Sequence, residues 1–154
     1  MNREISCAEL AALLASDELY AVCDVRERGE YNDGQIPGAT SLPRSQIEFR
    51  VAELVPDRRV PIILYDEEGE RAALASTTFR RVGYEQVFIL SGGLGQWRAT
   101  GRATTSGVNV PSKAFGERVH HERAVPDITP EELKALQEQS ADLMILDVRT
   151  PEEY

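Results

Sequence analysis

The residues best suited to chemistry lie in a short loop directly after the most apolar stretch of the chain. Residues 60–65 read Val-Pro-Ile-Ile-Leu-Tyr, which is typical of a strand buried on both faces of a sheet. Residues 66–71 follow as Asp-Glu-Glu-Gly-Glu-Arg and lead into a predicted helix over 70–82. In parallel sheets, ligands bind where strands end and helices begin. The pattern predicts an anion cradle of loop N–H groups, with Gly69 permitting the turn and Arg71 supplying positive charge.

The elements that must hold this loop alternate between strand and helix. Apolar runs predict strands at residues 20–25, 40–42, 60–65 and 86–90. Helical spacing of apolar residues predicts helices at residues 7–13, 44–54, 70–82 and 92–100. This alternation predicts an α/β fold with a small, mostly parallel sheet and helices on both faces.

The opening of the chain occurs twice. Residues 5–31 align without a gap against residues 128–154, and ten of the 27 aligned positions are identical. A Ser/Thr-x-x-Glu capping box starts a predicted helix in both copies, at Ser6 and at Thr129, and a predicted strand follows, over 143–148 in the second copy. We therefore expect a complete domain over 1–103, a linker over 104–127 and the truncated start of a second copy over 128–154. On this interpretation the chain is a fragment of a longer protein.

Composition narrows the class of protein. The chain has 154 residues, with 17 basic and 26 acidic side chains and a net charge of −9, which argues against a nucleic-acid partner. The sequence has no apolar signal core and no apolar run long enough to span a membrane. We therefore expect a cytoplasmic protein without a membrane partner. Cys7 and Cys23 have no CxxC partner, and we expect neither a metal nor a cofactor.

A set of ordered motifs resembles the rhodanese homology domain over residues 5–103. The residues that carry the resemblance are Asp24-Val-Arg26, Glu30-Tyr31, Gly34 with Ile36-Pro37-Gly38-Ala39, the loop 66–71 ending in Arg71, Leu90-Ser-Gly-Gly93, Trp97 and Gly101. The resemblance implies a sulfurtransferase fold with a small, mostly parallel five-stranded sheet, one strand more than the apolar runs predict. It also implies that active members hold a catalytic cysteine at the first loop position. That cysteine carries sulfane sulfur as a persulfide and passes it to a thiophilic acceptor.

The chain departs from this pattern at the first loop position, which is Asp66. A carboxylate cannot carry a persulfide, because the reaction needs a polarisable thiolate. The loop residues Asp66, Glu67, Glu68, Gly69, Glu70 and Arg71 sum to a charge of −3, which would repel thiosulfate. Cys7 and Cys23 are not expected to reach the loop. We therefore expect the loop to be degenerate, with no catalytic residue.

The Asp66 carboxylate is expected to occupy the cradle itself, accepting loop N–H bonds and pairing with Arg71. A solvated acidic turn is the alternative. Phosphoryl transfer through Asp66 is disfavoured, because the second aspartate such enzymes use is replaced by Glu68.

Asp24 and Arg26 are expected to form a structural ion pair. The glycines of residues 91–95 fail the dinucleotide fingerprint and are expected to allow close helix packing, with Trp97 in the core.

The sequence is compatible with two functions. The first is a catalytically silent domain of a tandem-domain sulfurtransferase of the thiosulfate type, whose active cysteine lies in a later domain. The repeat places the matching loop near residue 189, and the partner would be the other rhodanese-like domain of the same parent chain. The second is a regulatory or protein-binding module whose acidic loop docks a basic partner. A homodimer formed through residues 128–154 is also expected, because their apolar strand has no sheet to join.

Overall fold

The computed structural model describes residues 3–107, 116, 119–120, 122–123, 126–139 and 142–147. Contacts divide the chain into two compact units, residues 1–107 and residues 108–154. The predicted domain boundaries at 103 and 128 stay predictions.

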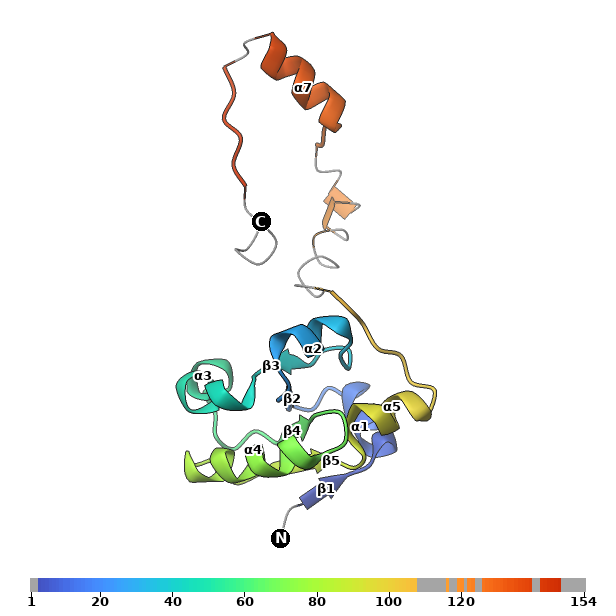
Figure 1. Cartoon of the computed structure of the whole chain (residues 1–154), viewed down its shortest axis with the longest axis vertical. Helices are drawn as coiled ribbons and strands as arrows, with labels where there is room; N and C mark the ends of the chain where they lie inside the picture. The colour runs from blue at the N-terminus through green and yellow to red at the C-terminus, as the bar shows by residue number, and fades with distance from the viewer. Residues whose placement is uncertain are drawn as a thin grey trace. The chain divides into compact units, whose positions relative to one another are not determined.

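The first unit is built on a five-stranded sheet in which every neighbouring pair is parallel (Figure 1). The strands are β1 (Arg3–Ile5), β2 (Ala21–Asp24), β3 (Thr40–Ser41), β4 (Ile62–Tyr65) and β5 (Val87–Leu90), in the order β1-β5-β4-β2-β3. The apolar strand β4 lies at the centre of the sheet and is buried along its whole length. The predicted α/β fold with a small parallel sheet is therefore confirmed.

Helices cover both faces of the sheet because successive side chains of β4 point to opposite sides. Ile62 and Leu64 pack into one core cluster with side chains of α3 (Ile47–Leu54) and α4 (Glu70–Arg81). Ile63 and Tyr65 pack into the other with α1 (Cys7–Leu14) and α5 (Gly93–Ala99). The loop after β4 is thus held between two packed layers.

Two elements of this unit were not predicted. The edge strand β1 has only three residues, and the side chains of Arg3 and Glu4 are exposed. Helix α2 (Arg28–Asp33) has six residues, and none of them is buried. A short 3-10 turn, η1 (Arg44–Gln46), precedes α3, so the predicted helix over 44–54 begins as a tighter turn. Neither β1 nor α2 has an apolar stripe that periodicity could detect.

The second unit contains helix α7 (Pro130–Glu138), which begins as the repeat predicts. The Thr129 side chain accepts a hydrogen bond from the Glu132 backbone, and the Glu132 carboxylate accepts one from the Thr129 backbone at 2.7 Å. The predicted strand over 143–148 is wrong for its described part, because residues 142–147 form no regular secondary structure. A strand needs a hydrogen-bonded neighbour, and none pairs with these residues in the described part of the chain. Val148 lies outside the described residues.

Within the described residues, no helix is both long and apolar enough to cross a membrane. The same residues contain no group of three His, Cys, Asp or Glu side chains that could hold a metal ion.

Candidate functional site

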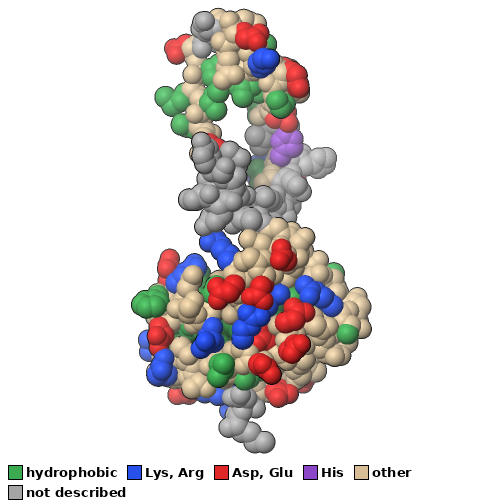
Figure 2. Space-filling view, in the orientation of Figure 1, with side chains coloured by type: hydrophobic (Ala, Val, Ile, Leu, Met, Phe, Trp, Pro, Cys, Tyr) green, Lys and Arg blue, Asp and Glu red, His purple; other side chains and the backbone are tan. Residues whose placement is uncertain are grey.

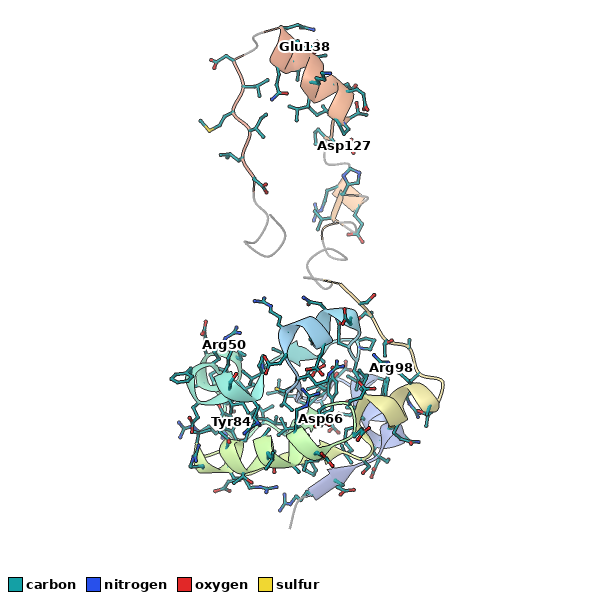
Figure 3. All side chains as sticks on the ribbon, in the orientation of Figure 1. Arg50, Asp66, Tyr84, Arg98, Asp127 and Glu138 are labelled. Atoms are coloured by element: carbon teal, nitrogen blue, oxygen red, sulfur yellow. The ribbon has the colours of Figure 1, made fainter. Side chains whose placement is uncertain are left out.

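The loop after β4 turns the chain directly into α4. Gly69 has a φ of +108°, in the left-handed region that favours glycine, and it is the residue before the first turn of the helix. This turn brings the N–H groups at the start of α4 back towards Asp66, the residue that follows β4. Figure 3 shows Asp66 beside the beginning of α4, with Arg98 projecting from α5.

The Asp66 carboxylate fills the centre of this loop. Its Oδ1 accepts hydrogen bonds from the backbone N–H of Glu68, at 3.0 Å, and of Gly69. Its Oδ2 accepts from the backbone N–H of Arg71 and of Ala72, the latter at 3.1 Å. Asp66 is only 2% exposed. The predicted occupation of the cradle by this carboxylate is confirmed, and the alternative of a solvated turn is wrong.

The start of α5 is hydrogen-bonded to the backbone of the loop. The N–H of Leu94 donates to the Asp66 carbonyl at 2.8 Å, and that of Gly95 donates to the Glu67 carbonyl at 3.0 Å. A Cβ on Gly93 would lie 2.5 Å from the Asp66 carbonyl oxygen, so only glycine fits there. The expectation that these glycines allow close packing is therefore confirmed. Trp97 is buried as predicted, and its Nε1 donates to the Ala103 carbonyl at 2.9 Å.

Arg71 does not pair with the Asp66 side chain, and that part of the prediction is wrong. Its guanidinium donates two parallel hydrogen bonds to Glu30 of α2, from Nη1 to Oε2 at 2.8 Å and from Nη2 to Oε1 at 2.7 Å. These bonds hold the pKa of Glu30 down, from 4.5 to about 2. The physical reason is that four backbone N–H groups already satisfy the Asp66 carboxylate. The Glu30 carboxylate accepts one other hydrogen bond from the described residues, from the Glu27 N–H at 3.0 Å, and so has acceptor capacity left for Arg71.

Asp24 and Arg26 form the predicted ion pair at the end of β2. Both residues are buried, and Arg26 Nη2 lies 2.6 Å from Asp24 Oδ2. The same Nη2 donates to the Gly34 carbonyl at 2.6 Å, and the guanidinium lies 5.9 Å from the centre of the Tyr65 ring. This pair ties the end of β2 to the turn after α2, which is a structural role.

Glu67 links the loop to two further arginines. Its Oε2 accepts from Arg26 Nη1 at 3.3 Å, and its Oε1 accepts from Arg98 Nη1 at 3.0 Å. This bridge was not predicted, because Arg98 lies 31 residues from Glu67, in α5, and belongs to no sequence motif. The Glu67 carboxylate therefore joins the loop to Arg26 and to Arg98 of α5, and its charge is paired.

The other residues of the resemblance shape the turn between α2 and β3. The Tyr31 hydroxyl donates to the Ala39 carbonyl at 2.7 Å, and the Tyr65 hydroxyl accepts from the Ile36 N–H at 3.2 Å. Gly38 has a φ of +81°, and Pro37 before it is half-buried. The turn and the loop are joined through the hydroxyl of Tyr65, the last residue of β4.

The mouth of the loop is a hollow of about 270 Å³ lined by acids and one base. Its lining residues are Asp66, Glu67, Glu68, Glu70 and Arg71. Figure 2 shows acidic and basic side chains side by side on the face of the first unit that it presents. Neither cysteine lines this hollow. Cys23 is buried within β2, where burial raises the pKa of its thiol to about 12, so it is not a nucleophile.

Comparison with known proteins assigns this arrangement to a class. Residues 6–100 match the model of the rhodanese-like domain, and the chain belongs to that family. It is 34% identical over 101 residues to a sulfurtransferase of Allochromatium vinosum, covering 66% of this chain and 92% of that protein. It is 32% identical over 94 residues to the putative sulfur carrier protein YrkF of Bacillus subtilis, covering 61% of this chain but only 50% of YrkF.

A solved structure resembles nearly the whole chain. The thiosulfate sulfurtransferase from Pseudomonas aeruginosa is 37% identical, with a TM-score of 0.85. The match covers 99% of this chain and 29% of the Pseudomonas chain. The chain therefore spans less than a third of this relative and half of YrkF.

Proposed function

We propose that this chain carries a catalytically silent rhodanese-like domain of a tandem-domain sulfurtransferase of the thiosulfate type. One observation carries the proposal: the Asp66 carboxylate, 2% exposed, accepts four backbone hydrogen bonds in the loop. By the family resemblance, a cysteine persulfide occupies this place in active members. A carboxylate neither attacks sulfur nor releases it, so the loop has no group that can carry the transfer.

The charges around the hollow support the same conclusion. Glu68 and Glu70 are exposed at its rim, and the charge of Arg71 is compensated by Glu30. A dianion such as thiosulfate would approach a rim that is negative on balance, and like charges at short range disfavour binding. The site therefore lacks both the nucleophile and the electrostatic attraction.

The tandem arrangement is supported by the repeat and by the relatives. Residues 128–139 reproduce the capping box of Ser6 and the helix that follows it. The Pseudomonas thiosulfate sulfurtransferase is a longer chain, of which the matched part is 29%. In such a parent, this domain would pack beside an active domain whose Cys-containing loop lies further along the chain, near residue 189 by the repeat.

A thiocyanate assay tests the proposal. The chain is incubated with thiosulfate and cyanide, and thiocyanate is measured against a buffer control and against a sulfurtransferase with a cysteine loop. We expect no thiocyanate above the buffer control. Turnover that scales with the concentration of the chain would refute the silent assignment.

A protein-binding module is the second candidate, because Glu68 and Glu70 are exposed and no ion pair holds either within the described residues. This function predicts that a Lys- and Arg-rich peptide binds at low salt and dissociates as salt rises. Calorimetry measures the affinity of the peptide for the chain and for the variant Glu68→Gln/Glu70→Gln at low and at high salt. Binding that is unchanged in the variant would exclude the rim as the docking surface.

A further inference from the structure

We infer that residues 102–107 form a detachable strap, which fixes the turn of residues 32–35 and, through that turn, holds Arg26 at the candidate site. The strap directly follows α5 and precedes the second unit in the sequence. Figure 1 shows this stretch leaving α5 and returning beside α2. The role of the strap is independent of the proposed function, because it concerns how the site is held and not whether the site is silent.

The strap is hydrogen-bonded to the turn after α2 as one strand is to an antiparallel neighbour. The Gln35 N–H donates to the Thr105 carbonyl at 2.8 Å, and the Thr105 N–H donates to the Gln35 carbonyl at 2.9 Å. The Gly107 N–H donates to the Asn32 carbonyl at 2.7 Å. Gln35 is only 2% exposed, so its backbone groups need partners within the protein. The strap supplies those partners.

The strap also covers the indole of Trp97, the single tryptophan of the chain. The Ala103 carbonyl accepts a hydrogen bond from Trp97 Nε1 at 2.9 Å, and the Arg102 guanidinium lies 5.3 Å from the centre of the ring. A buried indole N–H needs an acceptor. Detachment of the strap would remove this acceptor and expose Trp97 to water, so the fluorescence of Trp97 reports whether the strap is attached.

The turn that the strap fixes carries a contact of the candidate site. The Gly34 carbonyl, next to Gln35, accepts a hydrogen bond from Arg26 Nη2 at 2.6 Å. Arg26 Nη1 donates in turn to Glu67 Oε2 in the loop, at 3.3 Å. The turn is therefore bonded to the strap through Gln35 and to Arg26 through Gly34. A buried guanidinium that loses an acceptor is destabilised, so the position of the turn sets how firmly Arg26 is held.

The strap should detach without unfolding of the sheet. Its residues, all of them described by the structure, are exposed or half-buried, and none belongs to either core cluster. Segments with few buried apolar contacts open locally at a lower free energy than the whole domain. The strap therefore has an attached and a detached state, and the two states differ in the support that the turn gives to Arg26.

Amide hydrogen exchange of the unchanged chain in low urea tests the detachment. The N–H groups of Gln35, Thr105 and Gly107 should share one opening, with protection at least about 10-fold lower than that of β4. This opening should be insensitive to urea, because little surface is exposed. The Arg26 Nε–H should exchange through the same opening. Protection equal to that of β4 at Gln35 or at Arg26 would overturn the inference, because the strap would then not open separately or not reach the site.

The variant Thr105→Pro removes the central donor of the strap, because proline has no N–H. Exchange at Gln35 and at Arg26 Nε should become about 3- to 10-fold faster, the range for the loss of one hydrogen bond. The controls are Thr105→Ala, which keeps the N–H, and Thr104→Pro, at an exposed residue whose N–H donates to none of the described residues. Both should leave the two rates unchanged. Equal acceleration in Thr104→Pro and Thr105→Pro would overturn the inference, since the proline ring and not the lost bond would be the cause.

The double variant Thr105→Pro/Gly107→Pro lacks both N–H donors of the strap, and proline cannot adopt the φ of +112° of Gly107. Acrylamide should quench Trp97 at least about 2-fold more strongly than in the unchanged chain, with the circular dichroism of the fold retained. Retained circular dichroism with unchanged quenching would overturn the inference. Unfolding of the first unit in both the single and the double variant would also overturn it, since the strap would then be part of the core.

Discussion

Arg71 contacts Asp66 through its backbone and Glu30 through its side chain. The Arg71 N–H donates to Asp66 Oδ2, whereas the guanidinium donates to both oxygens of Glu30. One residue therefore closes the loop around its carboxylate and also ties the loop to α2. The charge of Arg71 is compensated outside the loop, so the loop depends on backbone hydrogen bonds to hold its anion.

Asp66→Asn should destabilise the first unit by about 1–3 kcal/mol. An asparagine side chain keeps one acceptor oxygen and replaces the other with an NH₂ group, which would face the N–H groups of two loop residues. Urea unfolding followed by circular dichroism measures the loss in the free energy of unfolding. Asp57→Asn is the matched control, and it should change stability little because its site is more open. Equal losses in the two variants would contradict the role of burial.

Acid should weaken the link between Glu30 and Arg71. The pKa of Glu30 is about 2 in the folded chain, below its ordinary value of 4.5, so the pair stabilises the fold fully above pH 4.5. This stabilisation is lost as the pH falls from 4.5 towards 2. Because the side chains of Glu30 and Arg71 are 40% and 41% exposed, we expect solvent screening to limit the pair to about 1 kcal/mol or less.

The contribution of the Glu30–Arg71 pair to stability is measured by comparing the unchanged chain with the variant Glu30→Gln. Their free energies of unfolding should differ most near pH 6 and converge near pH 2. Other acids titrate in the same window, Asp57 among them, so the difference between the two proteins is the quantity to follow. A gap that stays constant between pH 6 and pH 2 would show that Glu30 acts by packing and not by charge.

The sequence predicted four of the five strands, the four helices that pack on the sheet (α1, α3, α4 and α5) and the occupant of the loop, because each depends on local signals, but it missed β1 and α2. The apolar run of β4 and the loop that follows it are contiguous, so Asp66 could be placed beside its own donors. The partner of Arg71 could not be predicted, since Glu30 lies 41 residues away on a helix with no buried residue. The bridge from Glu67 to Arg26 and Arg98 likewise depends on how three elements meet at one end of the sheet.

Asp66→Cys alone should restore little sulfurtransferase activity. The variant gains a thiol at the first loop position but keeps Glu68 and Glu70 at the rim of the hollow. The triple variant Asp66→Cys/Glu68→Gln/Glu70→Gln should have a kcat/KM for thiosulfate about 10-fold higher than that of the single variant, because it attracts the dianion better. Glu67 is left unchanged because it clamps Arg26 and Arg98. Equal activity in the single and triple variants would show that rim charge does not limit the reaction.

Gly93→Ala should lower the free energy of unfolding of the first unit more than Gly101→Ala does. A Cβ on Gly93 would lie 2.5 Å from the Asp66 carbonyl oxygen and 2.6 Å from that of Glu67, and the φ of Gly93 is +58°. The clash and the left-handed backbone together predict a loss of about 3 kcal/mol in the free energy of unfolding. Gly101→Ala is the matched control, with a φ of +74° but no atom within 4 Å of the added Cβ. It should lose only about 1 kcal/mol, the backbone part of the cost. Denaturant unfolding of both variants separates the two contributions, and equal losses would mean that the loop moves away from α5 at little cost.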